Sequence, residues 1–222
     1  MRIFTVITLV CILTSSSRCS VAEDGAYDVL IRGGQIVDGT GNPWFRGSIG
    51  IKGDRIVAIG ALSDATATHT IDAAGLVVAP GFIDIHSHSD FLLFEDGNAQ
   101  SKIRQGVTTE ILGEGRSAGP FLDRLPPRKV TVNGDKLELR RLSDYFAAIK
   151  RAKVSPNIAS YVGIGNVWES VMGKSFNRPT DVQLEQMCNL VDQAMTDGAL
   201  GLSSQLMMPP GSLATTDDVV RL

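Results

Sequence analysis

Short strand patterns and helix patterns alternate along the chain from residue 81 to residue 222. A helical segment follows each of four strand-like segments, which occupy residues 81–86, 107–112, 157–165 and 199–204. Parallel strands need a long crossover connection, and helices commonly supply it. The pattern therefore predicts an α/β fold with about four βα units, whereas a closed (β/α)8 barrel needs eight units and about 250 residues. We expect an open sheet or an incomplete barrel, and a chain that stops within a helix pattern favours truncation.

The clearest helix is predicted for residues 179–198. Thr180 is a suitable N-cap, and Gly198 is a suitable terminator. Apolar side chains recur at helical spacing and are expected to share one face: Val182, Met187, Leu190, Val191 and Ala194.

Two further helices and one irregular segment complete the second part of the chain. A helix is predicted at residues 142–152, with Ser143 as its N-cap, and another begins at Thr215 or Thr216. The charged stretch at residues 120–139 is interpreted as a surface insertion.

Residues 27–79 contain shorter apolar runs that are separated by turn residues. Breaks at Gly33-Gly34, Gly53-Asp54 and Ala74-Gly75 divide this region into pairs of strands. Apolar runs with turns at this spacing are typical of β-hairpins. We therefore predict a small β-sandwich domain over residues 23–79, followed by an α/β domain over residues 80–222.

The first residues are typical of a secretory signal peptide. Arg2 precedes an apolar run at residues 3–14 that is short for a bilayer span, and Ser20 and Ala22 are small residues placed for cleavage before residue 23. We expect a signal peptide at residues 1–22, with an uncleaved N-terminal anchor as the alternative. Cleavage would give an exported protein, periplasmic or extracellular, without a stable membrane span.

Cysteine usage and charge narrow the class of protein further. Cys11 and Cys19 fall within the predicted signal peptide, so only Cys188 remains and no intramolecular disulfide is possible. An exported protein without disulfides fits a bacterial envelope. The net charge is −3 and the chain has no run of lysines or arginines, so we expect no nucleic-acid partner.

Two histidines follow the first strand of the second domain, in the segment Pro80-Gly-Phe-Ile-Asp-Ile-His-Ser-His-Ser-Asp90. Side chains alternate between the two faces of a strand, so His86 and His88 are expected to point the same way. Two imidazoles at the carboxyl end of a strand can bind one metal ion, and zinc accepts such ligands readily. The segment predicts a divalent metal site, with Zn²⁺ as the default ion.

This segment resembles the first metal-binding strand of the amidohydrolase superfamily, and four segments together resemble its D-aminoacylase group, the N-acyl-D-amino-acid deacylases. They are YDVLIRGGQIVDGTGNPW, PGFIDIHSHSD, RQGVTTEILGEGRSAGP and GALGLSSQLMMPPGSLAT. The resemblance implies a small β-sandwich with a metal-dependent (β/α)8 barrel, one or two zinc ions, and an N-acyl-D-amino acid as substrate. It implies hydrolysis of the amide bond.

The same resemblance implies a third metal ligand and a base outside the chain. Deacylases carry a metal-binding cysteine in a Gly-Asn-Cys-Gly loop after the second barrel strand, where this chain has Leu112-Gly113-Glu114-Gly115. A carboxylate can replace a thiolate on zinc, so Glu114 is the candidate, with a solvated loop glutamate as the alternative. The catalytic aspartate is expected beyond residue 222, in a missing C-terminal half of the barrel.

Two positions depart from the pattern of the group. Gly163-Ile164-Gly165 stands where Gly-His-Gly is common, so any contact made by that histidine is lost. Met208 stands where an aromatic residue is common, and it is interpreted as a packing residue. Both departures leave the acyl and amino-acid preference open.

The resemblance favours a deacylase, which we expect to be inactive alone as a truncated chain. Two other functions remain as alternatives. One is a cyclic amidase of the dihydroorotase or hydantoinase type, against which the last two resembling segments argue. The other is a non-catalytic half-barrel that binds metal or is held by a partner.

Overall fold

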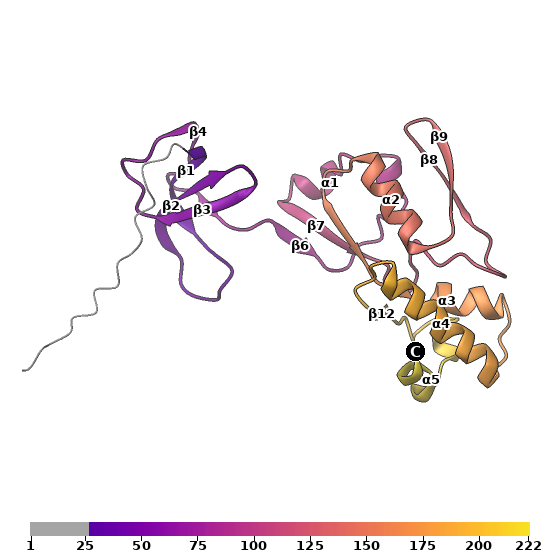
Figure 1. Cartoon of the computed structure of the whole chain (residues 1–222). Helices are drawn as coiled ribbons and strands as arrows, with labels where there is room; N and C mark the ends of the chain where they lie inside the picture. Colours follow the sequence, from indigo (N-terminus) through magenta and orange to yellow (C-terminus); the bar gives the residue numbers. More distant parts are fainter. Residues whose placement is uncertain (1–26) are drawn as a thin grey trace, which may run out of the picture. The chain divides into compact units, whose positions relative to one another are not determined.

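The chain divides at Pro80 into two units, Met1–Pro80 and Gly81–Leu222, and the computed structural model describes residues 27–222 (Figure 1). The predicted signal peptide at residues 1–22 lies outside the described residues. Within residues 27–222, no helix is both long enough and apolar enough to cross a membrane.

The first unit contains one mixed sheet. Its strands are β1 (Tyr27–Ile36), β2 (Phe45–Lys52), β3 (Arg55–Gly60), β4 (Ala67–Asp72) and β5 (Val77–Val78). The order is β3-β2-β1-β4, and β5 also pairs with β1. The pairs β1–β2 and β2–β3 are antiparallel, whereas β4 and β5 run parallel to β1. Leu30 and Ile36 on the central strand are the most deeply buried apolar side chains of this sheet.

Of the three predicted β-hairpins, the structure confirms one. Gly53-Asp54 joins β2 to β3, as predicted. Gly33-Gly34 does not end a strand, because β1 continues through a bulge in which the Gly33 N–H donates to the Ser48 hydroxyl at 3.2 Å. The strands on either side of Ala74-Gly75 pair with β1 rather than with each other. Residues 27–80 therefore form one sheet, and the predicted two-sheet sandwich is not present within them.

Parallel strands dominate the second unit. β6 (Phe82–Asp84), β7 (Val107–Leu112) and β10 (Asn157–Ser160) form a sheet in the order β10-β7-β6. β11 (Val162–Gly163) resumes one residue after β10 and pairs in parallel with β12 (Leu202–Ser203). Neighbouring strands thus follow chain order, as the alternating pattern predicts. Among residues 81–222 they do not close into a barrel.

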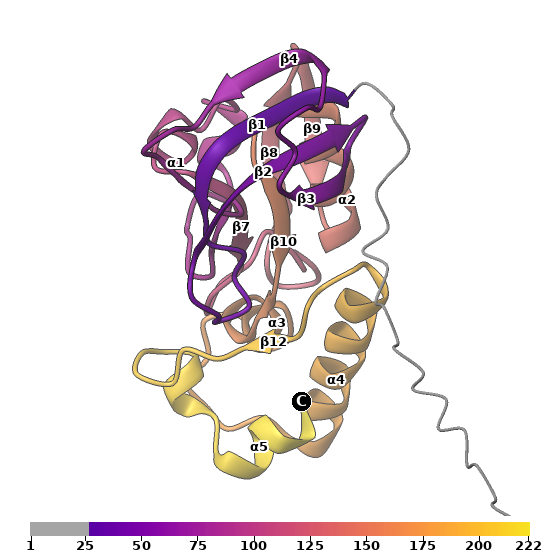
Figure 2. The same ribbon diagram turned by 90° about the vertical axis from the view of Figure 1, so that its left-hand side faces the viewer.

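Helices pack against these strands and bury the main core, and their course can be followed in Figure 2. They are η1 (Leu92–Phe94), α1 (Gln100–Ile103), α2 (Leu142–Ala152), α3 (Ile164–Met172), α4 (Asp181–Thr196), η2 (Gly211–Leu213) and α5 (Thr216–Arg221). Leu112 of β7, Tyr145 of α2, Trp168 of α3 and Met187 of α4 are fully buried in this core. Burial of large apolar side chains is the main stabilising contribution to such a fold.

The interpretation of residues 120–139 as an irregular insertion is wrong in its second half. β8 (Arg128–Val132) and β9 (Asp135–Leu139) form an antiparallel hairpin. Asn133 and Gly134 have φ values of +52° and +88°, as a two-residue hairpin turn requires. Val132 and Leu139 are buried against the helix layer, so the hairpin belongs to the packed fold.

Helix ends differ from the expectation in one case and agree in another. α2 is capped at Arg141 rather than Ser143, because the Asp144 carboxylate accepts from the backbone N–H groups of Arg140 and Arg141 at 2.9 and 2.8 Å. The predicted cap Thr180 is present at the start of α4.

The predicted apolar face of α4 needs one correction. Val182 is 70% exposed, whereas Leu184 is buried. Leu184 lies three residues before Met187 and so shares its face of the helix, whereas Val182 lies five residues before Met187 and points away from that face. Met187, Val191 and Ala194 are buried as predicted.

Candidate metal centre

The site lies just past the carboxyl ends of two adjacent parallel strands. β6 ends at Asp84 and is followed by His86 and His88, and β7 ends at Leu112 and is followed by Glu114. The Ser87 N–H donates to the Ile111 carbonyl at 3.2 Å, so the two segments stay side by side beyond the paired strands. Parallel strands bring their carboxyl ends to one edge, which is where active sites of barrel enzymes lie.

The three predicted ligands meet at this edge. Glu114 Oε2 lies 2.8 Å from His86 Nε2 and 3.4 Å from His88 Nε2, and the two Nε2 atoms are 3.2 Å apart. The three donor atoms lie within 4.8 Å of one another, so within residues 27–222 these side chains form a cluster that is compact enough to hold a metal ion. The structure therefore brings together residues that are 28 positions apart in the sequence, from His86 to Glu114.

These distances fit a zinc-sized ion. Zinc ligands lie about 2.0–2.2 Å from the metal, so tetrahedral donor atoms are roughly 3.3 Å apart. The observed triangle matches one face of such a tetrahedron. The side chains of His86, His88 and Glu114 are 61%, 62% and 34% exposed, so an ion could reach their donor atoms from solvent.

The loop that carries Glu114 depends on its flanking glycines. Gly113 has φ of +84° and Gly115 has φ of +67°. A Cβ on Gly113 would lie 2.3 Å from the Tyr161 carbonyl oxygen. Ser203 of β12 clamps the loop from the other strand pair: its Oγ accepts from the Gly115 N–H at 2.8 Å and donates to the Gly113 carbonyl at 2.7 Å.

A buried polar cluster supports the histidine segment from the opposite side. Glu110 of β7 is fully buried, and its Oε2 accepts from the hydroxyls of Ser87 and Ser89, both at 2.5 Å. Lys102 Nζ lies 3.8 Å from that same oxygen and 2.5 Å from Asp84 Oδ2. Lys102 therefore bridges two carboxylates beneath the metal candidates.

The charges in this cluster shift one another in the expected directions. The hydrogen bond from Lys102 is the main reason that the pKa of Asp84 is lowered, and the backbone N–H of His86, at 3.2 Å, adds to it. The hydrogen bond to Asp84 in turn raises the pKa of Lys102. Both groups are therefore charged at neutral pH.

The end of the segment is anchored on helix α2. The Tyr145 hydroxyl donates to the Asp90 backbone carbonyl at 2.8 Å. Asp90 is 7% exposed, and burial raises the pKa of its carboxyl to about 6. Among the described residues, its Oδ1 has no hydrogen-bond partner.

The two positions that depart from the deacylase pattern lie in different surroundings. Ile164 is buried at the first residue of α3 rather than on a strand. Met208 is 53% exposed and precedes the Pro209-Pro210 turn.

Sequence patterns alone missed the residues behind the site. Glu110 was part of a strand pattern, and Ser203 was part of another. One sequence signal pointed to residues behind the site. Serines alternate with histidines in residues 86–89, so in an extended segment the histidines lie on one face and the serines on the other.

Known proteins resemble the chain over most of its length. The model of the Amidohydrolase family matches residues 69–219. A D-aminoacylase from Alcaligenes xylosoxydans xylosoxydans is 37% identical over 206 residues, which cover 91% of this chain and 43% of that protein. The chain therefore spans less than half the length of this curated relative.

Solved structures give the same result. A D-aminoacylase structure described in terms of its binuclear metal centre superposes with a TM-score of 0.78 and 35% identity, covering 88% of this chain and 42% of that one. An N-acyl-D-glutamate deacylase from Bordetella bronchiseptica, complexed with zinc and a phosphonate inhibitor, superposes with a TM-score of 0.78 and 33% identity, covering 89% and 42%.

Proposed function

The chain belongs to the amidohydrolase family, and we propose that it carries part of the metal centre of a hydrolase that cleaves the amide bond of N-acyl-D-amino acids. The observation that carries the proposal is the triangle of His86, His88 and Glu114 donor atoms, with sides of 2.8 to 3.4 Å. The substrate class is proposed from the deacylase relatives, of which the chain spans only part.

His86, His88 and Glu114 are proposed to hold a divalent ion, with Zn²⁺ favoured by two imidazoles and one carboxylate. When bound, such an ion polarises a carbonyl and lowers the pKa of a bound water towards neutrality. The contribution of this chain is to fix the three donors at one strand edge. A carboxylate has two oxygens, so Glu114 would be compatible with one ion or with two.

Metal binding can be tested at the three donors separately. We expect His86→Ala, His88→Ala and Glu114→Gln each to weaken zinc binding at least about tenfold, because each removes one of three ligands. His69→Ala is the matched control, since His69 is exposed on β4 in the first unit. Competition with a chromogenic chelator measures the affinities. Unchanged zinc binding in all three variants would refute the assignment.

The reaction requires a separate assay in the whole protein. We expect release of free amine from N-acetyl-D-amino acids, with slower release from the L-enantiomers and no opening of hydantoin. Opening of hydantoin with no release from N-acetyl-D-amino acids would favour a cyclic amidase. Zinc binding without turnover of either substrate would favour a non-catalytic metal-binding role.

A further inference from the structure

Residues 86–89 present two kinds of side chain on opposite sides. The imidazoles of His86 and His88 are exposed and face Glu114. Ser87 is buried and Ser89 is half-buried, and both hydroxyls point to Glu110. The segment has no regular strand pairing beyond Asp84, so the serines are its main side-chain anchors.

Glu110 is an unusual residue for its position. It lies on β7 at the same face as Leu112, which belongs to the apolar core, and its side chain is 0% exposed. Burial of a carboxylate is unfavourable unless hydrogen bonds and charges compensate for it. Here Oε2 receives both hydroxyls, whereas Oε1 has no partner among the described residues. An apolar side chain would suit the strand better, so the carboxylate calls for another role.

The neighbouring charges complete a rigid support. Lys102 lies 3.8 Å from Glu110 Oε2 and 2.5 Å from Asp84 Oδ2, so one ammonium compensates both carboxylates. Asp84 in turn accepts from the backbone N–H of His86 at 3.2 Å. The backbone before the first histidine and the side chains around the second are therefore fixed to one cluster.

We propose that Glu110 is a positioning residue that orients His86 and His88 for metal binding through the hydroxyls of Ser87 and Ser89. The proposal rests on the metal site proposed above. Glu110 lies on the helix side of the sheet and is not a ligand itself. It fixes the backbone between the two histidines through Ser87 and the backbone after His88 through Ser89, so that the imidazoles do not need to be ordered when the ion binds. Residues behind a metal site commonly change metal affinity by about 10- to 100-fold.

The test compares variants that remove the contact in different ways. Ser87→Ala with Ser89→Ala deletes both donors, Glu110→Leu deletes the acceptor, and Glu110→Gln keeps a carbonyl oxygen that still accepts. Ser101→Ala is the matched control, because Ser101 is exposed on α1 next to Lys102 and its hydroxyl makes no hydrogen bond in the described part of the chain.

Two readouts separate positioning from stability. Zinc affinity is measured by chelator competition, and the visible absorption of the Co²⁺-substituted protein reports the geometry around the metal. We expect the double serine variant and Glu110→Leu to bind zinc about 10- to 100-fold more weakly with an altered Co²⁺ spectrum. Glu110→Gln should retain most of the affinity, and Ser101→Ala should match the wild type. Thermal unfolding confirms that each variant is folded.

Failure of this inference is distinguishable from failure of the proposed function. Wild-type zinc affinity and an unchanged Co²⁺ spectrum in the double serine variant would overturn the role of Glu110. If His86→Ala still loses zinc in that case, the proposed metal site itself is supported. A wild-type protein that binds no zinc would overturn both. If Glu110→Leu does not fold, the double serine variant and Glu110→Gln carry the test.

Discussion

At the scale of single residues, Gly113 sets the shape of the turn that carries Glu114. Its φ of +84° disfavours any other residue, and a Cβ would lie 2.3 Å from the Tyr161 carbonyl oxygen and 2.6 Å from Ser160 Oγ. Left-handed backbone costs a non-glycine residue about 1–2 kcal/mol, and overpacking adds about 1–3 kcal/mol. We expect Gly113→Ala to lower the free energy of unfolding by roughly 2–5 kcal/mol, measured by urea denaturation.

Gly134 supplies the matched control for this substitution. It has nearly the same φ, +88°, but a Cβ there would meet nothing within 4 Å. Gly134→Ala should therefore show only the backbone cost of about 1–2 kcal/mol. Equal losses of stability in Gly113→Ala and Gly134→Ala would show that the close approach to Tyr161 is not important.

Ser203 makes a second prediction at the residue scale. Ser203→Ala removes the hydroxyl that joins the Gly115 N–H to the Gly113 carbonyl. Leaving these groups without a partner is expected to destabilise the fold by about 1–3 kcal/mol and to weaken zinc binding, because the loop of Glu114 loosens. Ser204→Ala, at an exposed neighbour, should change stability by no more than about 0.5 kcal/mol. Equal zinc affinities in both variants would contradict this view of the loop.

Single residues of the site differ in how far the sequence predicts them. His86 and His88 follow from alternation along one strand. Glu114 was a candidate only through the resemblance of its loop to the metal-binding loop of the deacylases. Ser203 could not be found this way, because it lies 90 positions from the carbonyl it contacts. Its partner depends on how β11 pairs with β12, which the local pattern does not encode.

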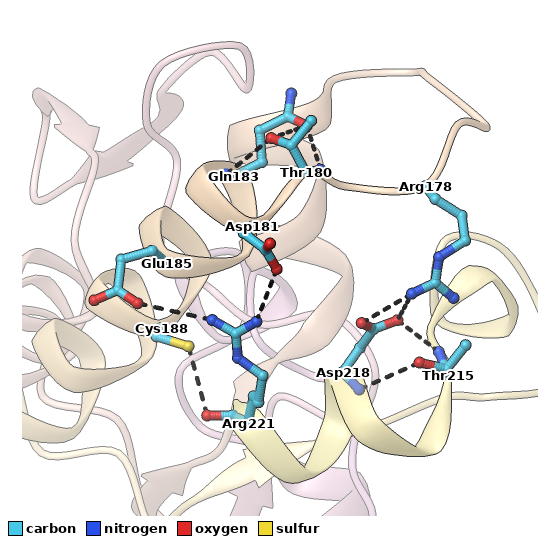
Figure 3. A network of polar contacts seen from close by, with 9 residues as sticks. All are labelled: Arg178, Thr180, Asp181, Gln183, Glu185, Cys188, Thr215, Asp218 and Arg221. Carbon is cyan, nitrogen blue, oxygen red and sulfur yellow. Dashed lines mark hydrogen bonds and ion pairs between the residues drawn. The ribbon is translucent and has the colours of Figure 1, made fainter.

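At the scale of elements, helix α5 illustrates how one carboxylate holds a helix start. Thr215, one of the two predicted starts, is the N-cap, and its backbone N–H donates to Asp218 Oδ2 at 2.8 Å. Arg178 contacts the same carboxylate at 3.0 Å, and Arg221 near the end of the helix reaches back to Asp181 of α4 (Figure 3). These contacts join α5 to the start of α4.

Asp218 predicts a pH dependence for this element. Burial opposes its ionisation, but hydrogen bonds from Thr215 and the charge of Arg178 outweigh burial and lower the pKa of the carboxyl below its ordinary value. Because the folded pKa is lower than the unfolded one, the stabilisation is present above about pH 4 and is lost as the pH falls through the folded pKa.

The prediction is tested with a neighbouring pair of aspartates. Asp218→Asn should lower the free energy of unfolding at pH 7 by about 1–2 kcal/mol, and the difference from wild type should shrink below about pH 4. Asp217→Asn is the control, since Asp217 is exposed in the same turn. Urea denaturation at several pH values gives the comparison. A difference that stays constant down to pH 2 would exclude the ionised Asp218 as its source.

Elements were predicted well where a pattern was long and less well where it was short. The 16-residue helix α4 carries several turns of periodicity, so its position was clear. α3 was hidden, because Ile164 continues the apolar run of a two-residue strand before the helix begins. Asn133-Gly134, between β8 and β9, is a strong signal for a hairpin turn. It was overlooked because the many charged residues around it suggested an irregular surface insertion.

At the scale of the whole molecule, the sheet of the second unit has one buried face and one exposed face. The helix layer covers Leu112, whereas Ile83 and Ile85 are 59% and 71% exposed. Within residues 81–222, β6 and β12 each pair with a single strand, so both leave an unpaired edge. Exposed apolar faces and unpaired edges promote association with other chains or segments.

We therefore expect a protein consisting of these 222 residues to self-associate, and we expect the apolar face to drive it. Ile83→Ser with Ile85→Ser should reduce the associated fraction in sedimentation velocity, because these side chains are mostly exposed and contribute little to the core. Leu112→Ser, at a fully buried position, should instead unfold the protein. A monomeric wild-type chain at concentrations of tens of micromolar would contradict the expectation. Association that is unchanged in the double variant would assign it to the strand edges instead.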